Sequence, residues 1–590
     1  MMRYLPWIAL SAALASVPFL STYHASLAVY AVVLALFCTS VNIVVGYLGL
    51  ISFGHAAFLG LGAYTAGLLT VKLGVNYWLA VVLGMLPGAA LGALVGFASL
   101  RLSGAYFAIA TLVVSEILRI VAMNWIDLTR GALGLLVPKP GVGPFGFEGL
   151  RFTHSHLIIA ILALATVLFL VSRLVASPYG RAWLLLRDQP KLAASVGISG
   201  LRYKTLAVAV SGAIAALAGG MLVPKILVLT PDLFSSTLSA TGLLGAILGG
   251  RATIAGPVLG GAIFAVAPEL LRFVEEYRIA VFALLLLAVV RIRPEGLMSL
   301  LPRRRRHARH ARTQPNDVEI APRTALADIR VDRLTKSFGG LAAVRDVTFP
   351  IPRGQVLGII GPNGAGKTTC LNLISAFLTP SSGQVTMGER VISDSQPHET
   401  ARHGIVRTFQ HTTLSAGKTV LENVVAATHL LERETLPGAL WRGAGFRRRE
   451  ADRLALGWAC LDYVGLGERA DMEAGSLAYG EQRMLSIAIT LATKPHFLLL
   501  DEPAAGLNHS EAMAFAALIE NLREKGFTVV IVDHNLRMML RICDRLVVMH
   551  HGELLADGDP MEVRNNPEVI SAYLGGGPRK QKEAADVEMH

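Results

Sequence analysis

The alternation of hydrophobic and polar positions changes near the middle of the chain. From Leu5 to about Leu301 the sequence is a series of apolar runs, many of them about 17 to 25 residues long and therefore able to cross a bilayer as helices. After Pro302 charge, apolar clusters and turn residues alternate as in a soluble protein. We therefore predict an all-helical membrane domain at residues 1–301, a basic linker at 302–328, a soluble α/β domain at 329–577 and a polar tail at 578–590.

The apolar runs predict about ten crossings, some of them short or broken. Glycines together with Pro257 and Pro268 interrupt the last part of the membrane half, and such breaks are tolerated where the backbone lines a cavity or packs against protein. The candidate spans are Pro6–Leu20, Leu27–Val45, Phe53–Val71, Tyr77–Leu100, Tyr106–Met123, Leu157–Ala176, Thr205–Val228, two short pieces between Ser239 and Phe273, and Ile279–Val290.

The first of these runs allows a second interpretation. It has a basic residue, an apolar core and small residues near Ser16, as a signal peptide does. A second apolar run follows at once from Leu27. The topology requires the first run to stay, so we expect a retained span.

Basic residues gather on one side of this topology. Counting the spans puts Arg3, Arg101, the loop Arg173–Lys204 and the region Arg291–Arg312 on the same side, which the positive-inside rule identifies as the cytoplasm. The run "RRRRHARHARTQPND" at Arg303–Asp317 is then what topology requires, with incidental contact to anionic lipid. We expect no nucleic-acid binding, because no aromatic or helical recognition pattern accompanies the run.

The soluble half contains a phosphate-binding loop. In "VLGIIGPNGAGKTTCLNLI" an apolar strand pattern leads into G-x-x-x-x-G-K-[ST] and then into an apolar helical pattern. The backbone N–H groups of such a loop surround phosphate oxygens, the lysine reaches the β and γ phosphates, and the threonine hydroxyl can ligate Mg²⁺. The flanking pattern disfavours a chance match. The predicted nucleotide-binding residues here are Gly361, Asn363, Gly364, Gly366, Lys367, Thr368 and Thr369.

Two adjacent acids follow a second apolar strand pattern, "HFLLLDEPAAGLN". At the strand's end Asp501 would support Mg²⁺, directly or through water, and Glu502 would polarise the water that attacks the γ-phosphate. An acidic turn after a core strand is the neutral alternative, and it is disfavoured by the phosphate loop earlier in the chain.

Between these motifs lies "GSLAYGEQRMLSIAITL", a glycine-containing turn that opens a helix. Helix N-termini favour anions through free N–H groups and the helix dipole. "LAYGEQ" resembles the signature motif of ABC transporter ATPases, and "RTFQ", "LLLDEPAAGLN" and "VDHN" stand in the order which that family uses.

The resemblance implies further roles. Phe338 would stack on adenine, Gln410 would sense the γ-phosphate and Mg²⁺ and face the membrane domain, and His534 would contact the γ-phosphate. Mg²⁺ would be held by Thr368, Gln410 and Asp501, partly through water. The family pairs its ATPase domains head to tail, so that each ATP also meets the signature helix of the opposite subunit, here Ala478, Gly480 and Glu481.

Two positions depart from the family pattern. Ala478 stands where serine is most common, so the backbone N–H groups around Gly480 must carry more of the contact with the γ-phosphate. Asp533 precedes His534 where glutamate or threonine is common, and we expect little effect. Alanine does occur at the signature position in the most similar subfamily, so we do not predict an inactive site.

The membrane half resembles the permeases of branched-chain amino acid importers. The likeness rests on "NIVVGYLGLISFGHAAFLGLGAYTAGLL", on "YGRAWLLLRDQPKLAASVGISGLRYKTLAVAVSGAIAALAGG" and on "LGAILGGRATIAGPVLGGAIFAVAPELL". The soluble half resembles an ATPase of the same system, including "HLLERETLPGALWRGAGFRRRE" and "GDPMEVRNNPEVISAYLG". The chain thus looks like a fusion of a permease with an ATPase.

This resemblance implies ATP-driven import across the inner membrane, with the ATPase domain in the cytoplasm. The expected partners are a second permease and a second ATPase, or a second copy of the chain, and an external substrate-binding protein. Branched-chain amino acids are the expected substrates, with urea, short amides or aromatic acids as the alternative. An ABC exporter is less consistent, because exporters typically have fewer, longer spans with large cytoplasmic extensions.

Three smaller features complete the sequence predictions. Gly180–Ile198 resembles the coupling helix that docks near Gln410, with a solvated loop as the alternative. In "SFGHAAF" Ser52 and His55 are either functional polar groups or part of a close helix packing through Gly54, Gly60 and Gly62. The cysteines Cys38, Cys370, Cys460 and Cys543 have no metal-binding spacing, so we expect them to be structural.

Overall fold

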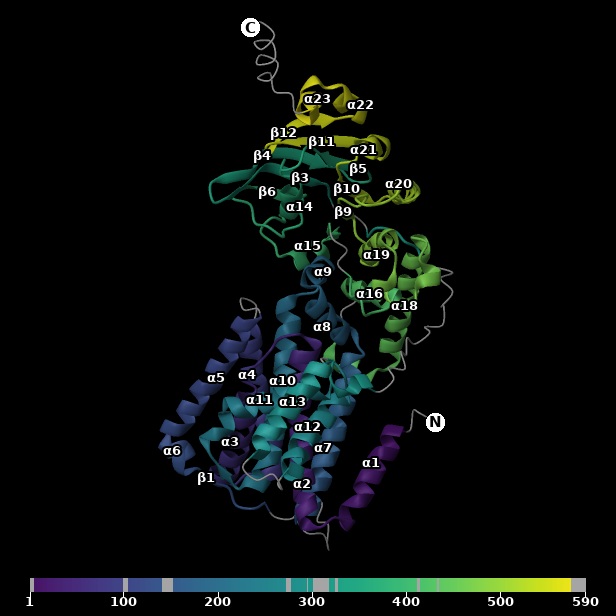
Figure 1. Cartoon of the computed structure of the whole chain (residues 1–590). Helices are drawn as coiled ribbons and strands as arrows, with labels where there is room; N and C mark the ends of the chain where they lie inside the picture. The colour runs from purple at the N-terminus through teal and green to yellow at the C-terminus, as the bar shows by residue number, and fades with distance from the viewer. Residues whose placement is uncertain are drawn as a thin grey trace, which may run out of the picture. The chain divides into compact units, whose positions relative to one another are not determined.

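The computed structural model describes residues 5–98, 104–140, 152–271, 277–293, 295–300, 318–323, 327–410, 414–431 and 434–574 (Figure 1). The chain forms two compact units, the first from Met1–Arg187 with Gly200–Arg306 and the second from Asp188–Ser199 with His307–His590. The basic residues Arg3 and Arg101, the arginine run at 303–317 and the polar tail lie outside the described residues.

The first unit is helical, as predicted. Among the residues described in this unit, six helices are long and apolar enough to cross a membrane: α2 (Thr22–Asn42, continued by the π-helical turn Ile43–Tyr47), α3 (Ala56–Leu73), α4 (Tyr77–Ala98), α5 (Ala105–Asn124), α7 (Phe152–Val175) and α10 (Gly200–Ile226). The described part of the unit also has four shorter apolar helices, α1 (Leu5–Ser16), α11 (Ser236–Gly249), α12 (Gly256–Leu270) and α13 (Arg278–Ile292). The ten predicted runs are therefore all helices, and these four have only 12, 14, 15 and 15 residues.

Small residues let the central helices α3, α4 and α10 approach closely. A Cβ atom added at Gly62 would clash with the backbone of Ala216, and one at Gly92 would lie 2.5 Å from Val208 O. Gly54 is in similar contact with the backbone of Thr111, and Gly60 with the ring of Phe234. Close packing through small residues is a main source of helix association in membranes, so the glycines of the "SFGHAAF" region act in packing.

The histidine of that region is also satisfied by neighbours. His55 is fully buried, and its Nδ1 and Nε2 hydrogen-bond with Ser52 Oγ (2.9 Å) and Ser211 Oγ (2.7 Å). The Ser211 hydroxyl donates in turn to Ser40 O at 2.6 Å. These bonds join α2, α3 and α10, and they give Ser52 and His55 a structural role.

The second unit contains a mostly parallel sheet in the order β12-β11-β5-β10-β9-β8. Its strands are β5 (Val356–Ile360), β8 (Ile405–Arg407), β9 (Phe497–Asp501), β10 (Thr528–Val532), β11 (Arg545–His550) and β12 (Glu553–Gly558), of which β12 alone is antiparallel to its neighbour. Strands β5, β9 and β10 are buried throughout, which explains their continuous apolar sequences. A second, antiparallel sheet has the order β4-β3-β6-β7 and consists of β3 (Ile329–Phe338), β4 (Leu341–Ile351), β6 (Ser382–Met387) and β7 (Arg390–Val391).

Helices flank these sheets and build a mainly helical part of the unit (Figure 1). They are α14 (Lys367–Ile374), α15 (Pro397–Arg402), α16 (Val420–Ala427), α17 (Leu436–Trp441), α18 (Ala444–Tyr463), α19 (Tyr479–Leu491), α20 (His509–Glu524), α21 (Leu536–Ile542), α22 (Pro560–Asn565) and α23 (Pro567–Leu574). The four cysteines are free and buried, in agreement with a structural role.

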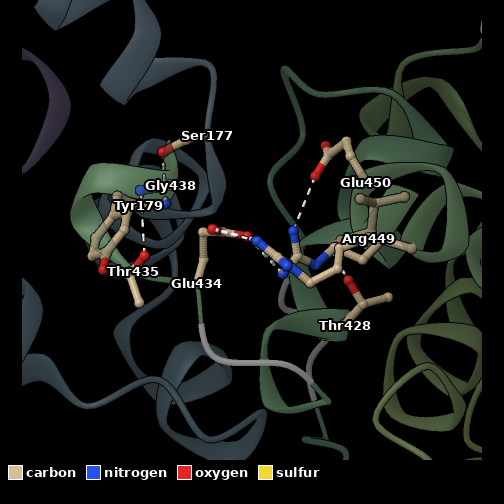
Figure 2. A network of polar contacts seen from close by, with 10 residues as sticks. Ser177, Tyr179, Thr428, Glu434, Thr435, Gly438, Arg449 and Glu450 are labelled. Atoms are coloured by element: carbon tan, nitrogen blue, oxygen red, sulfur yellow. Dashed lines mark hydrogen bonds and ion pairs between the residues drawn. The ribbon is translucent and has the colours of Figure 1, made fainter. Parts of the chain in front are cut away.

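A buried carboxylate organises the segment that leads into α18. Both side-chain oxygens of Glu434 accept hydrogen bonds from Arg449, at 3.0 and 2.8 Å (Figure 2). Arg453 lies 3.8 Å from the same carboxylate and donates to Glu450 at 3.2 Å. The side chains of Glu434 and Arg453 are only 1% and 4% exposed, so these two charges stabilise each other away from water.

Candidate ATP-hydrolysis site

The phosphate loop joins β5 to α14 at the carboxyl edge of the parallel sheet. Gly361, Gly364 and Gly366 have φ angles of 148°, 81° and 94°, which only glycine adopts readily. A Cβ atom at Gly366 would also clash with Ala343 O. These glycines therefore fix a loop whose exposed tip includes Asn363.

Lys367, the first residue of α14, folds back into this loop. Its Nζ donates to Gly361 O at 2.8 Å and to Pro362 O at 2.9 Å. Burial lowers the pKa of Lys367, and the carboxylates of Glu502, Asp501 and Asp533 act in the opposite direction. The ammonium group is thus held where it can move to an incoming phosphate.

A pocket of about 410 Å³ opens beside the loop. Its wall includes Thr368, Gln410 and Asp501, three of the predicted site residues, and it is completed by Lys191, Asn372, Phe377, Leu378, Arg407 and Phe409. The structure therefore brings the phosphate loop, the Gln410 segment and the end of β9 together.

The two acids after β9 have different environments. Asp501 is buried, and its Oδ2 accepts a hydrogen bond of 2.7 Å from Arg407 Nη2. Its other oxygen, Oδ1, is buried with no hydrogen-bond partner among the described residues. A buried oxygen in this state fits a further ligand such as a water molecule or a hard cation.

Glu502 points instead toward Gln410. Gln410 Nε2 donates to Glu502 Oε2 at 2.7 Å, and the backbone N–H of Glu502 donates to Val532 O at 2.7 Å. The φ angle of Glu502 is 46°, a left-handed conformation that costs on the order of 1 to 3 kcal/mol for a residue of this kind. The strained backbone and the amide together orient the predicted catalytic carboxylate.

The loop after β10 carries His534 and its neighbour. The side chain of His534 is 60% exposed, with Nδ1 3.9 Å from Asp533 Oδ1. Asp533 accepts hydrogen bonds from the backbone N–H groups of Ala504 (3.2 Å) and Asn535 (2.9 Å). The aspartate thus ties the loops after β9 and β10 together, a role that the sequence did not predict.

Phe338 lies apart from this cluster. It ends β3 before the turn Gly339–Gly340, is 47% exposed, and has Lys336 Nζ 5.5 Å from its ring centroid. An exposed aromatic ring beside a cation is suited to stack on a base that carries phosphates.

The signature residues form the start of α19. Ala478 is its N-cap residue, and its backbone N–H donates to Glu481 Oε2 at 3.1 Å. Alanine offers no side-chain oxygen to the first N–H groups of the helix, so these remain available to an anion. Among the described residues, Ala478, Gly480 and Glu481 do not line the pocket beside Thr368.

Two buried arginines were missed by the sequence interpretation. Arg407 holds Asp501, and Arg483 donates to Phe409 O (3.3 Å) and to Tyr479 OH (2.7 Å), which joins the signature helix to the Gln410 segment. Arg407 is the first residue of "RTFQ" and Arg483 directly follows "LAYGEQ", so their places in the sequence were the available signal, although neither was assigned a role.

The predicted coupling segment is two helices rather than one. α8 (Pro178–Asp188) and α9 (Pro190–Ser195) are separated at Gln189, because Pro190 disfavours a helical conformation for the residue before it. Residues Asp188–Ser199 belong to the second unit. Within it Gln189 Nε2 donates to Leu414 O at 3.2 Å, and a Cβ atom at Gly197 would clash with Leu430.

Comparison with known proteins places both halves of the chain. Residues 23–290 match the family described as the permease component of the branched-chain amino acid transport system. Residues 344–505 match the ABC transporter family, and residues 553–578 match the branched-chain amino acid ATP-binding cassette transporter family.

The ATPase half also has close relatives along nearly their full length. The chain is 41% identical over 248 residues to the high-affinity branched-chain amino acid transport ATP-binding protein LivG of Salmonella typhimurium, which is 42% of this chain and 97% of that protein. The chain belongs to the branched-chain amino acid ABC transporter family. It is a fusion of the permease domain, at the N-terminal end, with a LivG-like ABC ATPase, and this ATPase is an ATP hydrolase coupled to transport.

Two further relatives match the ATPase half of the chain. The corresponding protein BraF of Pseudomonas aeruginosa is 42% identical, over 42% of this chain and 97% of BraF. The lipopolysaccharide export system ATP-binding protein LptB of Acidithiobacillus ferridurans is 34% identical, over 42% of this chain and 96% of LptB. Because an export ATPase is also similar, the ATPase half by itself does not indicate the direction of transport.

Proposed function

We propose that this transporter imports branched-chain amino acids, with permease and ATPase in one chain. The observation that carries the proposal is that the hydrogen-bonded pair Gln410–Glu502 occurs in a chain whose membrane half matches a branched-chain amino acid permease. The transporter lies in the inner membrane with its ATPase domain in the cytoplasm. We place the membrane domain at 1–301, the linker at 302–328 and the ATPase domain at 329–577, in line with the change in composition along the chain.

ATP is hydrolysed by attack of a water molecule on its γ-phosphate. Glu502 orients and polarises this water, and Gln410 holds the carboxylate in place until the nucleotide arrives. Lys367 exchanges its two carbonyl partners for the β and γ phosphates, while the loop glycines, Asn363 and Thr369 surround them with N–H groups. His534 contacts the γ-phosphate from the loop after β10.

Each nucleotide meets residues of two ATPase domains. Phe338 stacks on adenine from the same domain as the phosphate loop. Ala478, Gly480 and Glu481 come from the opposite domain, and their position away from the pocket supports this arrangement. The assembly therefore needs a second ATPase and a second permease, or a second copy of this chain, together with an external substrate-binding protein.

The residues present fit a magnesium ion. The unpartnered Oδ1 of Asp501, the exposed hydroxyl of Thr368 and the amide oxygen of Gln410 border one pocket, and oxygen ligands of this kind suit Mg²⁺. When bound there, the ion would neutralise charge on the phosphates.

The proposal is tested by ATP-dependent uptake of labelled leucine into proteoliposomes that contain the chain, its partner subunits and the binding protein. Uptake should vanish in Glu502→Gln and persist in Glu389→Gln, a matched change of an exposed glutamate in the β6–β7 turn. If the wild-type chain hydrolyses ATP while leucine stays outside, the substrate assignment is wrong, and urea, short amides and aromatic acids are tested next.

A further inference from the structure

Helix α5 carries two opposite charges inside an apolar span. In "AYFAIATLVVSEILRIVAMN" the charged residues are Glu116 and Arg119. At a rise of about 1.5 Å per residue, Glu116 lies about 16 Å along the helix from Ala105, and Arg119 about 8 Å from Asn124. Ionisable groups at this depth are rare in membrane proteins and mark functional sites.

The two side chains form a close ion pair. Arg119 Nε donates to Glu116 Oε1 and Oε2 at 3.0 and 2.9 Å, and Arg119 Nη2 donates to Oε1 at 2.7 Å. The side chains remain 27% (Arg119) and 45% (Glu116) exposed in the isolated chain. The same helix exposes the apolar residues Ile109, Leu112, Val113, Ile117, Ile120 and Val121.

A third charge comes from another part of the chain. Asp232 lies in the 3₁₀ turn η4 (Pro231–Phe234), which is held to α5 by a 2.8 Å hydrogen bond from Ser115 Oγ to Phe234 O. Asp232 is exposed, and Ser115 lies one turn before Arg119 on the same face of α5, so the η4 turn brings the carboxylate of Asp232 to the side of the helix that carries the guanidinium group. The region therefore combines one guanidinium group with two carboxylates.

Such a group of charges is unfavourable against lipid, so it faces protein or a water-filled path in the assembled transporter. A pair that only neutralised itself would need no third charge. One cation flanked by two anions matches a zwitterion, because the guanidinium can bind a carboxylate in a bidentate manner and the remaining carboxylates can accept an ammonium group. Uncharged solutes such as urea or amides offer no equivalent compensation.

We propose that Arg119, Glu116 and Asp232 form a solute-binding site on the transport path, which recognises the carboxylate and ammonium groups of an α-amino acid. The topology predicted from the basic residues places this site in the outer half of the span, where solute arrives from the binding protein. The inference rests on the proposed import function and narrows its substrate class to zwitterions.

The decisive variant exchanges the two charges, Glu116→Arg with Arg119→Glu. It keeps an i, i+3 ion pair on the same helix but reverses its direction, so a purely structural pair would be retained. In proteoliposomes with an unaltered binding protein, we expect leucine uptake to fall on the order of tenfold or more, since a site built for a charged group rejects the wrong partner strongly. Ile120→Leu is the control and should transport normally, because exposed Ile120 lies four residues after Glu116 and so on the same face of the helix.

Asp232→Asn provides an independent second variant, because the residue is exposed and its replacement leaves the helices intact. We expect a fall in leucine uptake of severalfold, on the order of one lost charged hydrogen bond. The amount of assembled complex is measured for each variant by size-exclusion chromatography.

Three results would overturn the site. Near-normal uptake by the assembled exchange variant would assign the pair a structural role, and normal uptake by Asp232→Asn would remove the third charge from the site; in both cases the import function stands. Wild-type uptake of labelled urea with none of leucine would overturn the site and the proposed substrate together.

Discussion

The buried ion pair between Arg407 and Asp501 makes the sharpest energetic prediction. Their side chains are 3% and 2% exposed and 2.7 Å apart. Replacing Arg407 with methionine removes the guanidinium and leaves a carboxylate without its counter-charge in the centre of the ATPase unit. Breaking a buried pair in this way costs about 3 to 5 kcal/mol.

Hydrogen exchange of the intact chain can measure this cost. The backbone amides of β9 exchange through openings of the sheet, and every 1.4 kcal/mol changes such an equilibrium about tenfold. In Arg407→Met we therefore expect protection of these amides to fall by roughly two to four orders of magnitude. Arg353→Met is the matched control, because Arg353 pairs with Asp328 at a similar 3.0 Å but with both side chains about half exposed, and such pairs contribute about 0 to 1 kcal/mol.

The double variant Arg407→Met with Asp501→Asn separates charge from packing. Removing the uncompensated carboxylate should restore about half or more of the lost protection, since the amide has no charge to bury. If the two single losses instead add in the double variant, the side chains do not interact as a pair, and Arg407 does not hold the carboxylate of Asp501.

Three further predictions concern coupling, protonation and the signature helix. Gly197→Leu should abolish leucine uptake while ATP hydrolysis continues, because Gly197 has a φ angle of 80° and its Cβ position is occupied by Leu430; unchanged uptake would contradict docking of this segment. Burial lowers the pKa of Lys367, so its positive charge is present at neutral pH and is lost at a lower pH than that of an ordinary lysine. The affinity for ATP should therefore weaken toward alkaline pH in the wild type and stay constant in Lys367→Arg, and equal pH profiles of the two proteins would refute this. Ala478→Ser supplies the missing N-cap oxygen of α19, so it should stabilise the first turn of this helix by about 1 kcal/mol. Hydrogen exchange of the amides in that turn measures the change, and an unchanged exchange rate would show that the N-cap does not control the opening of the turn.

Local motifs made much of this molecule predictable from sequence. The loop from Gly361 to Thr368, the strand that ends at Asp501 and the helix that begins after Ala478 each combine a period of apolar residues with a short chemical signal, and the structure has them at the expected places. Gln410 and Glu502 are 92 residues apart, and their proximity followed only from the resemblance to a family. Six of the apolar spans were equally clear, because their length identifies them, whereas the four shorter apolar helices lack that signal.

Contacts between residues far apart in the chain could not be predicted from the sequence. The contact between Arg407 and Asp501 depends on β8 lying next to β9, and nothing local in either strand specifies that neighbour. The break at Gln189 had a local signal in Pro190. That α8 belongs mostly to the membrane unit and α9 to the ATPase unit depends on tertiary contacts. Glu116 and Arg119 were visible as charges in a span, whereas the approach of Asp232 required the folded η4 turn.

The division of the chain into units has a consequence for assembly. Because residues 188–199 belong to the ATPase unit while the sequence on both sides of them belongs to the membrane unit, the chain passes from one unit to the other at three points. The two units belong to one molecule, so each is present near the other at an effective concentration that for short tethers reaches the millimolar range. Each copy of this chain therefore brings one permease domain and one ATPase domain into a complex together, in a ratio that does not depend on how much of either is made.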